Sequence, residues 1–190
     1  METKSNNTYS STNQITVFQR ILELFNYRTL LWTLAWRDIR VRYKQSLLGI
    51  LWAMFIPVAM MLLFSFIFTK VVKVVTDIPY PIFAYSGLLP WQFFSSATTT
   101  ATNSLIANRS LVTKIYFPSE VFPLSCIVAA FVDFMVGTLV LVVLMIYYSV
   151  IGSSITVNWT VFFVVPVIIV QLLFTAGISF FLAMSNLFFR

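Results

Sequence analysis

Side chains that could carry chemistry are scarce in this chain, and this scarcity already excludes several classes of protein. The 190 residues contain no histidine and one cysteine, Cys126. Without histidine, the common acid–base pairs, catalytic triads and most zinc sites cannot be assembled. No G-x-x-x-x-G-K-[ST] sequence is present, so ATP cannot be bound through a phosphate loop of that kind. We therefore expect no enzyme activity, no catalytic residues, no metal site and no cofactor in this chain.

One acidic side chain, Asp133, lies inside a long apolar stretch. It follows Cys126 and Ala130 and precedes Gly137 at helical spacing, which puts it on a face of small residues. An ionisable group at membrane depth costs about 2.5–3.5 kcal/mol on insertion scales. A proton or ion relay would need a second ionisable group in another apolar segment, and the sequence offers none. We favour pairing with a buried donor or with a base near the membrane surface, and a relay is the alternative.

The composition explains where such an aspartate can lie. Hydrophobic residues make up 59% of the chain and charged residues only 9%, whereas soluble domains carry about 25% charged residues. This indicates an all-α integral membrane protein. Membrane-spanning helices need about 20 mostly apolar residues. Four segments qualify, at residues 47–69, 82–106, 121–151 and 157–189, within a transmembrane region at 46–190.

The positive charges predict the orientation of these segments. Lys and Arg gather in cytoplasmic loops of membrane proteins. With the N-terminus in the cytosol, ten of the 12 basic residues lie inside, leaving only Lys70 and Lys73 outside. The net charge of +6 therefore reflects topology and does not indicate nucleic-acid binding. Residues 1–14 are polar and are expected to form a disordered cytosolic tail.

A basic stretch directly before the first apolar segment predicts an amphipathic helix at the membrane surface, within residues 15–45. Trp32, Trp36, Ile39 and Tyr43 recur at helical spacing as an apolar stripe, and Asp38 is placed to pair with Arg42. Such a helix would lie on lipid headgroups. The alternative is a plain positive anchor without a defined helix. The residues expected at the headgroups are Trp36, Arg37, Arg40, Arg42, Tyr43 and Lys44.

The loop at 106–120 is too apolar for a freely solvated turn and too polar for a membrane segment. A short amphipathic helix that stops before Pro118 fits this pattern. The loop would serve as a docking surface on the cytosolic side, or it would fold back on its own bundle. The residues expected to take part are Asn108, Arg109, Ser110, Leu111, Lys114, Phe117 and Pro118.

Polar residues inside the second and fourth segments are open to two interpretations. They could line a polar route across the membrane, or they could hydrogen-bond between helices, which contributes about 0.6 kcal/mol on average. Hydroxyl residues are dense at 95–104, and aromatic residues, on which sugars commonly stack, surround the outer half of the second segment. The candidates for a translocation path are Tyr85, Trp91, Phe94, Thr98, Gln171 and Ser179.

Three motifs together resemble a known family. They are R-x-x-Y-K-x-S-x-L-G-x-x-W at residues 40–52, G-L-x-P-W at 87–91 and N-R-x-L-x-x-K-x-x-F-P at 108–118. In combination they are similar to the membrane subunit of ABC-2 type exporters of polysaccharides and polyol phosphates, which include permeases for O-antigen, capsule and teichoic acid. The resemblance covers essentially the whole chain after the tail.

This resemblance implies a permease that dimerises, binds two cytosolic ATPase subunits and moves a polyprenyl-diphosphate-linked glycan across the bacterial inner membrane. ATP and magnesium would be bound by the partner subunit. The 106–120 loop would be the coupling loop that docks on the ATPase, and the 30–45 segment would be the interface helix.

Family members have six spans, and we expect this chain to lack the last two after Arg190, which makes transport by this chain alone uncertain. Other readings stay open. An ABC-2 permease for drugs or small lipids and a non-transporting scaffold are alternatives. A transferase acting on lipid-linked substrates is disfavoured because no acidic pair is available.

Overall fold

The computed structural model describes residues 27–44, 50–73, 76, 78–109, 118–151 and 159–189. Within these ranges every regular element is a helix, which confirms the all-α expectation. The helices are α2 (Arg28–Lys44), α3 (Ile50–Phe66) with the π-helical extension η1 (Ile67–Val71), α4 (Tyr80–Ala107), α6 (Val121–Val150), the 3₁₀ turn η2 (Trp159–Phe163) and α7 (Val164–Phe188).

Two of the four predicted segments match their helices closely, and the fourth, at 157–189, includes the 3₁₀ turn η2 as well as α7. The segments at 82–106 and 121–151 agree with α4 and α6 to within two residues. Pro57 lies inside α3 without ending it. Pro166 lies in the first turn of α7, where the missing N–H of a proline is tolerated. Residues 1–26, most of the 106–120 loop and residues 45–49 lie outside the described ranges.

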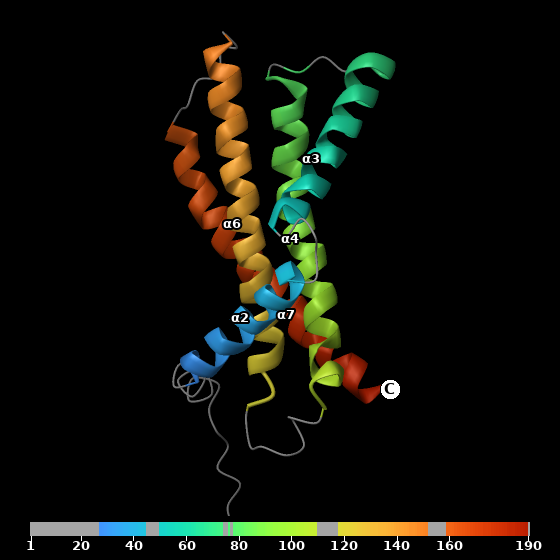
Figure 1. Ribbon diagram of the computed structural model, residues 1–190, viewed down its shortest axis with the longest axis vertical. Helices are drawn as coiled ribbons and strands as arrows, with labels where there is room; N and C mark the ends of the chain where they lie inside the picture. The colour runs from blue at the N-terminus through green and yellow to red at the C-terminus, as the bar shows by residue number, and fades with distance from the viewer. Residues whose placement is uncertain are drawn as a thin grey trace, which may run out of the picture.

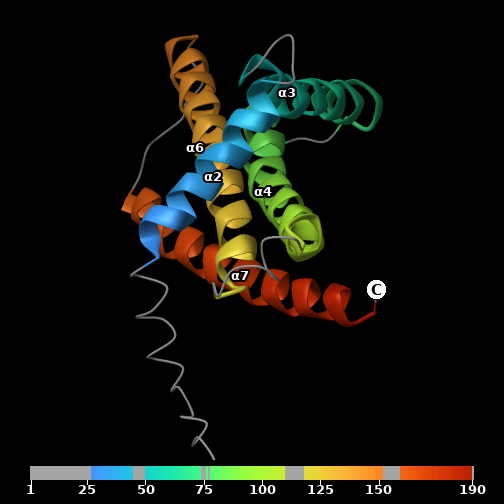
Figure 2. The same cartoon turned by 60° about the horizontal axis from the view of Figure 1, so that its bottom comes forward.

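Helix α4 is the central element of the bundle. It contacts α3, α6 and α7, while α2 lies diagonally across α6 near the end of the bundle where α4 ends and α6 begins. We call this the Asn108 end. Turning the molecule shows α7 crossing behind the other helices along the opposite side from α2 (Figures 1 and 2).

Small residues let α4 and α6 approach closely. On α4 the buried side chains recur every four residues and include Ala97 and Ala101, which face Cys126 and Ala130 of α6. At Gly137 the contact is closest, because a Cβ atom there would lie 2.3 Å from Cδ1 of Leu89. The predicted face of small residues on α6 is therefore a helix contact, as such faces are in membrane proteins.

The polar residues of α7 face α4. Thr175 and Ser179 are fully buried. On either side of them, Gln171 Nε2 donates a 2.8 Å hydrogen bond to the Pro90 carbonyl, and Asn186 Nδ2 donates a 3.0 Å bond to the Thr102 carbonyl. Gln171 and Asn186 thus join the two helices, whereas the buried hydroxyls of Thr175 and Ser179 have no hydrogen-bond partner among the described residues.

The outward surfaces of α6 and α7 are those of a membrane protein. Two helices, Val121–Val150 and Val161–Phe188, are long and apolar enough to cross a bilayer, and α6 at 30 residues is about 45 Å long. Many large apolar side chains on both are exposed. A shorter apolar helix runs from Phe55 to Val71. That α3 and α4 also span the membrane stays a prediction, because α4 is shielded by three neighbours and carries many hydroxyl groups.

The close contact at Gly137 makes this position intolerant of a larger residue. We expect Gly137→Ala to lower the free energy of unfolding by about 1–3 kcal/mol, because Leu89 is buried and must leave its rotamer. The matched control is Gly87→Ala on α4, where a Cβ meets nothing within 4 Å. This variant should leave the free energy of unfolding unchanged or raise it by up to about 1 kcal/mol, because alanine lowers the backbone entropy of the unfolded chain. Thermal unfolding in detergent measures both, and equal effects would contradict this packing.

Candidate functional site

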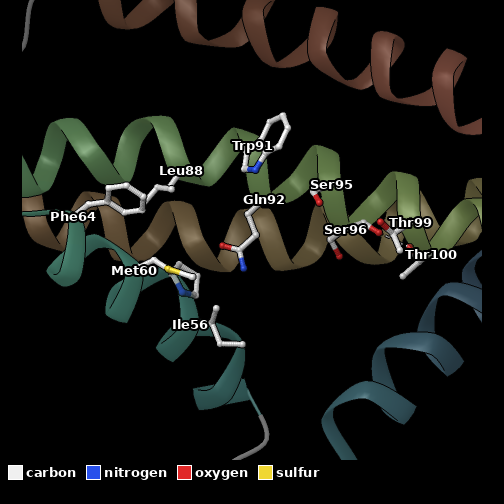
Figure 3. Close-up of a pocket in the computed structure, with 11 residues that line it drawn as sticks. Ile56, Met60, Phe64, Leu88, Trp91, Gln92, Ser95, Ser96, Thr99 and Thr100 are labelled. Atoms are coloured by element: carbon white, nitrogen blue, oxygen red, sulfur yellow. Dashed lines mark hydrogen bonds between the residues drawn. The ribbon is translucent and has the colours of Figure 1, made fainter.

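An open groove separates α3 from α4 and has a cavity volume of about 590 Å³. Its α3 wall is apolar, whereas its α4 wall carries hydroxyl and amide groups along one face of the helix (Figure 3). The α3 wall consists of Ile56, Pro57, Met60 and Phe64. The α4 wall consists of Leu88, Trp91, Gln92, Ser95, Ser96, Thr99 and Thr100.

The chemistry of the groove is that of a binding surface. None of its lining residues is ionisable, so the lining offers no general acid or base of the usual kinds and no base that would activate its serine and threonine hydroxyls as nucleophiles. Hydroxyl and amide groups donate and accept hydrogen bonds, and the indole of Trp91 is 65% exposed. The groove therefore suits a ligand that is neutral along its length, with both polar and apolar faces.

The six candidates for a translocation path fall in different places. Trp91 lines the groove. Phe94 stacks on Phe174 of α7 with ring centres 5.8 Å apart. Tyr85 is fully buried and donates a 3.2 Å hydrogen bond to the Gly137 carbonyl.

The other three candidates, Thr98, Gln171 and Ser179, have polar groups in helix contacts: Gln171 bonds α4, and the hydroxyls of Thr98 and Ser179 are buried. The structure thus brings one of the six to the groove. It adds residues that the sequence analysis did not select: Gln92, Ser95, Ser96, Thr99, Thr100 and the α3 wall.

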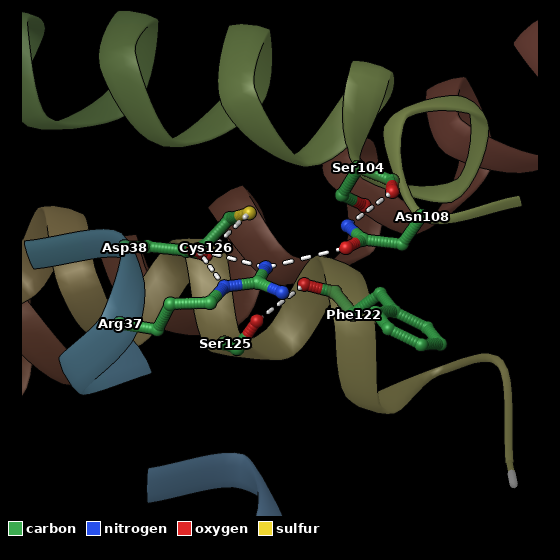
Figure 4. Close-up of polar contacts among 7 residues, drawn as sticks. All are labelled: Arg37, Asp38, Ser104, Asn108, Phe122, Ser125 and Cys126. Atoms are coloured by element: carbon green, nitrogen blue, oxygen red, sulfur yellow. Dashed lines mark hydrogen bonds and ion pairs between the residues drawn. The ribbon is translucent and has the colours of Figure 1, made fainter. Parts of the chain in front are cut away.

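A second polar site joins three helices at the Asn108 end (Figure 4). Arg37 of α2 donates to Asp38 Oδ1 through Nε (3.1 Å) and Nη2 (2.9 Å), and Nη2 also donates to Asn108 Oδ1 at 3.3 Å. The second carboxylate oxygen of Asp38 accepts from the thiol of Cys126 on α6 at 3.8 Å. Asn108, which follows the last residue of α4, donates from Nδ2 to the Ser104 carbonyl at 2.9 Å.

Asp133 pairs with two residues of α2. Arg42 forms an ion pair with it, and the Tyr43 hydroxyl donates a hydrogen bond to its other oxygen. Burial raises the pKa of Tyr43, and the hydrogen bond to Asp133 raises this pKa further, so the hydroxyl stays a neutral donor. The expected pairing of Asp133 with a base is confirmed. The expected pair of Asp38 with Arg42 is wrong, because Arg42 reaches α6 and Asp38 binds Arg37 instead.

These contacts show how α2 lies. Asp133 is 12 residues beyond Val121, which is about 18 Å along α6. Since Asp38 meets Cys126 and Arg42 meets Asp133, α2 climbs along α6 from the Asn108 end. A helix lying flat against the end of the bundle would not make both contacts.

The predicted apolar stripe on α2 is partly buried and partly exposed. Ile39 is buried, as are Leu34 and Ala35, because the narrow apolar face packs toward the bundle. Trp32 and Trp36 are exposed and stack with centroids 6.5 Å apart, and the Arg40 guanidinium lies 5.8 Å from the Trp36 ring centre. The expected helix is present, and its stripe meets the bundle at Ile39 and Tyr43 and is exposed at Trp32 and Trp36. Contact of its exposed face with headgroups stays a prediction.

Only the ends of the predicted coupling loop are described. Asn108 and Arg109 follow α4, and the Pro118 carbonyl accepts a 3.2 Å hydrogen bond from the Val121 amide. Four of the residues expected in the loop lie outside the described residues: Ser110, Leu111, Lys114 and Phe117. Lys44 is the last residue of α2.

The Arg42–Asp133 pair yields a stability prediction. Asp133→Leu leaves the Arg42 cation without its partner at depth, and we expect a loss of about 3–5 kcal/mol in the free energy of unfolding. Arg42→Met leaves the Asp133 carboxylate without a counter-charge and should lower the free energy of unfolding by a similar amount. The double variant removes both charges and should recover most of the loss, since apolar replacements of buried pairs are often neutral. Thermal unfolding in detergent measures all three; a double variant as unstable as the sum of the singles would contradict the pairing.

Comparison with known proteins adds an independent observation. A family model described as "ABC-2 type transporter" matches residues 29–189. The O-antigen export system permease protein RfbA of Klebsiella pneumoniae is 37% identical over 156 residues, covering 81% of this chain and 58% of the relative. RfbA of Myxococcus xanthus is 35% identical over 171 residues, covering 90% and 63%.

A shorter match, to the polysialic acid transport protein KpsM of Escherichia coli, is 36% identical over 76 residues, covering 40% of this chain and 30% of the relative. The chain thus spans about three fifths of the length of the RfbA relatives that it matches. The family match includes α2, both walls of the groove and the residues that hold Asp133. This chain belongs to the ABC-2 type transporter family of membrane proteins.

Proposed function

We propose that this chain is the permease subunit of an ATP-driven exporter that moves a lipid-linked polysaccharide across the bacterial inner membrane. The groove between α3 and α4 is the observation that carries this proposal. It holds hydroxyl and amide groups in a row along α4 and contains no ionisable side chain. A glycan passing along such a wall meets uniform, neutral hydrogen-bonding groups and binds without being held at one position.

The substrate we propose is a glycan on a polyprenyl diphosphate. Sugar hydroxyls would bond Ser95, Ser96, Thr99 and Thr100, and a sugar ring would stack on the exposed indole of Trp91. The apolar α3 wall supports a second candidate, an exporter of a drug or small lipid, because Met60 and Phe64 offer contacts for an acyl or aromatic group. The two candidate functions are distinguished by whether purified glycan or an amphipathic drug competes with the exported substrate.

The energy would come from a partner. Two cytosolic ATPase subunits would bind ATP and magnesium and dock on the 106–120 loop, and two copies of the permease would close the path between them. We place the N-terminus in the cytosol and the exposed face of α2 with Arg40 at lipid headgroups, while Arg37 and Arg42 contact other residues of the bundle. Names of the relatives support export of polysaccharide, and the family supports an ATPase partner.

Blocking the groove tests the proposed route. We expect Ser96→Phe to lower glycan export at least tenfold, because the new ring points from the α4 wall into the groove, while ATPase binding stays intact. Ser86→Phe is the matched control: Ser86 is exposed on the same helix and does not line the groove. Export is measured as polymer reaching the cell surface. Normal export in the Ser96 variant would exclude this route.

Docking on the loop is tested by Leu111→Asp. A charge in an apolar contact should break binding of the ATPase, because an unpaired carboxylate is costly to desolvate. We expect the tagged wild-type chain to co-purify with an ATPase from mild detergent and the variant to lose it. An ATPase retained in full by the variant would contradict docking through this part of the loop, and a folded wild type without any ATPase would contradict the partner itself.

A further inference from the structure

We propose that Arg37 is a positioning residue that joins α2 to the base of the coupling loop through Asn108, so that movement of the loop is carried to α2. This inference rests on the proposed function, because it assumes that an ATPase moves the loop. It assigns a role to a contact that neither the sequence motifs nor the groove accounts for.

The contact is directional on both sides. The Asn108 amide donates from Nδ2 to the Ser104 carbonyl (2.9 Å), which turns its Oδ1 toward Arg37. The guanidinium is held in turn by two bonds to Asp38 Oδ1, and Cys126 occupies the other oxygen of that carboxylate. Figure 4 shows the resulting chain of contacts from α4 through α2 to α6. Each of these side chains is oriented by its hydrogen bond to the next one.

The position of Asn108 shows which two parts of the protein this contact joins. Asn108 follows the last residue of α4 and precedes the loop, so it lies where a moving loop meets a packed helix. An apolar cluster also brings α2 and α4 together there, through Leu34 and Leu105 among others. Apolar contacts are not directional, and they allow the helices to slide. The Arg37–Asn108 hydrogen bond defines one relative position of loop base and α2.

Helix α2 has a second and stronger attachment. Five residues after Arg37, Arg42 binds Asp133 about 18 Å along α6. A push received at Arg37 therefore reaches α6 at membrane depth through one short helix. The two attachments differ in strength, because Arg37 reaches Asn108 through a single 3.3 Å hydrogen bond, whereas Arg42 forms an ion pair with Asp133 that the Tyr43 hydroxyl supports. A contact that contributes little to stability and yet orients two moving parts is suited to positioning.

The test uses the chain in complex with the ATPase that co-purifies with it, reconstituted in liposomes. We expect Arg37→Gln and Asn108→Leu each to lower the amount of substrate transported per ATP hydrolysed about tenfold, the change in a conformational equilibrium on losing one hydrogen bond from a charged donor. The double variant should be no worse than either single variant. Asn108→Asp loses the donor to Ser104 but keeps the acceptor and adds an ion pair with Arg37, so it should retain part of the coupling.

Two measurements separate positioning from stability and from charge. Arg28→Gln removes the same charge from the first turn of α2 and should couple normally. Thermal unfolding and co-purification of ATPase should be nearly unchanged in the Arg37 and Asn108 variants. Normal coupling in Arg37→Gln, a loss in Asn108→Asp equal to that in Asn108→Leu, or a loss that only follows a lower melting temperature would each overturn the proposal. If the wild-type complex binds an ATPase but transports nothing, the proposed function itself fails.

Discussion

The close packing of α4 against α6 is the contact on which the rest of the arrangement depends. Buried residues recur every four positions on α4, and where they meet Gly137 there is no room even for a Cβ atom. Because that face packs against α6, the polar residues of α4 lie on the faces toward α7 and toward α3. Some meet α7, where Gln171 and Asn186 bond the α4 backbone. The remaining row faces α3 and forms the polar wall of the groove.

A similar constraint governs α2. An aspartate 12 residues inside α6 cannot stay unpaired in a membrane without a large penalty. Arg42 and Tyr43 supply the counter-charge and a hydrogen bond, and they can do so only if α2 rises along α6. The polar pairing thus sets the direction of the helix. It explains why Ile39 is buried while Trp32 and Trp36 remain outside.

Single-helix properties could be predicted from the sequence, whereas the use of each helix face could not. Apolar length located α6 and α7, and small residues at helical spacing identified the face of α6 that meets α4. Asp133 could be expected to find a base because the cost of leaving it unpaired is large. Which base it finds depends on how α2 crosses α6, so the local i, i+4 rule wrongly assigned Arg42 to Asp38.

The groove shows the same limit. Hydroxyl residues at 95–104 surround much of α4, and their types do not indicate which of them face a neighbour. Thr98 and Ser96 differ by two positions, yet the Thr98 hydroxyl is buried in a helix contact and Ser96 lines the groove. Only the positions of α6 and α7 decide this. The four-residue spacing from Leu88 through Gln92, Ser96 and Thr100 marks a common face, and the packing of its neighbours leaves that face open.

The separation of charge from the groove has a mechanical consequence. Four charged residues that make interhelical contacts, Arg37, Asp38, Arg42 and Asp133, connect α2 to α4 and α6, and none of them lines the groove. A charged wall would hold a substrate at particular points and would make each step along it costly. Placing the charges on α2 instead allows strong, directional contacts between α2 and its neighbours. Under the proposed function, the neutral wall would bind a long polymer weakly at every position, which would let the polymer advance.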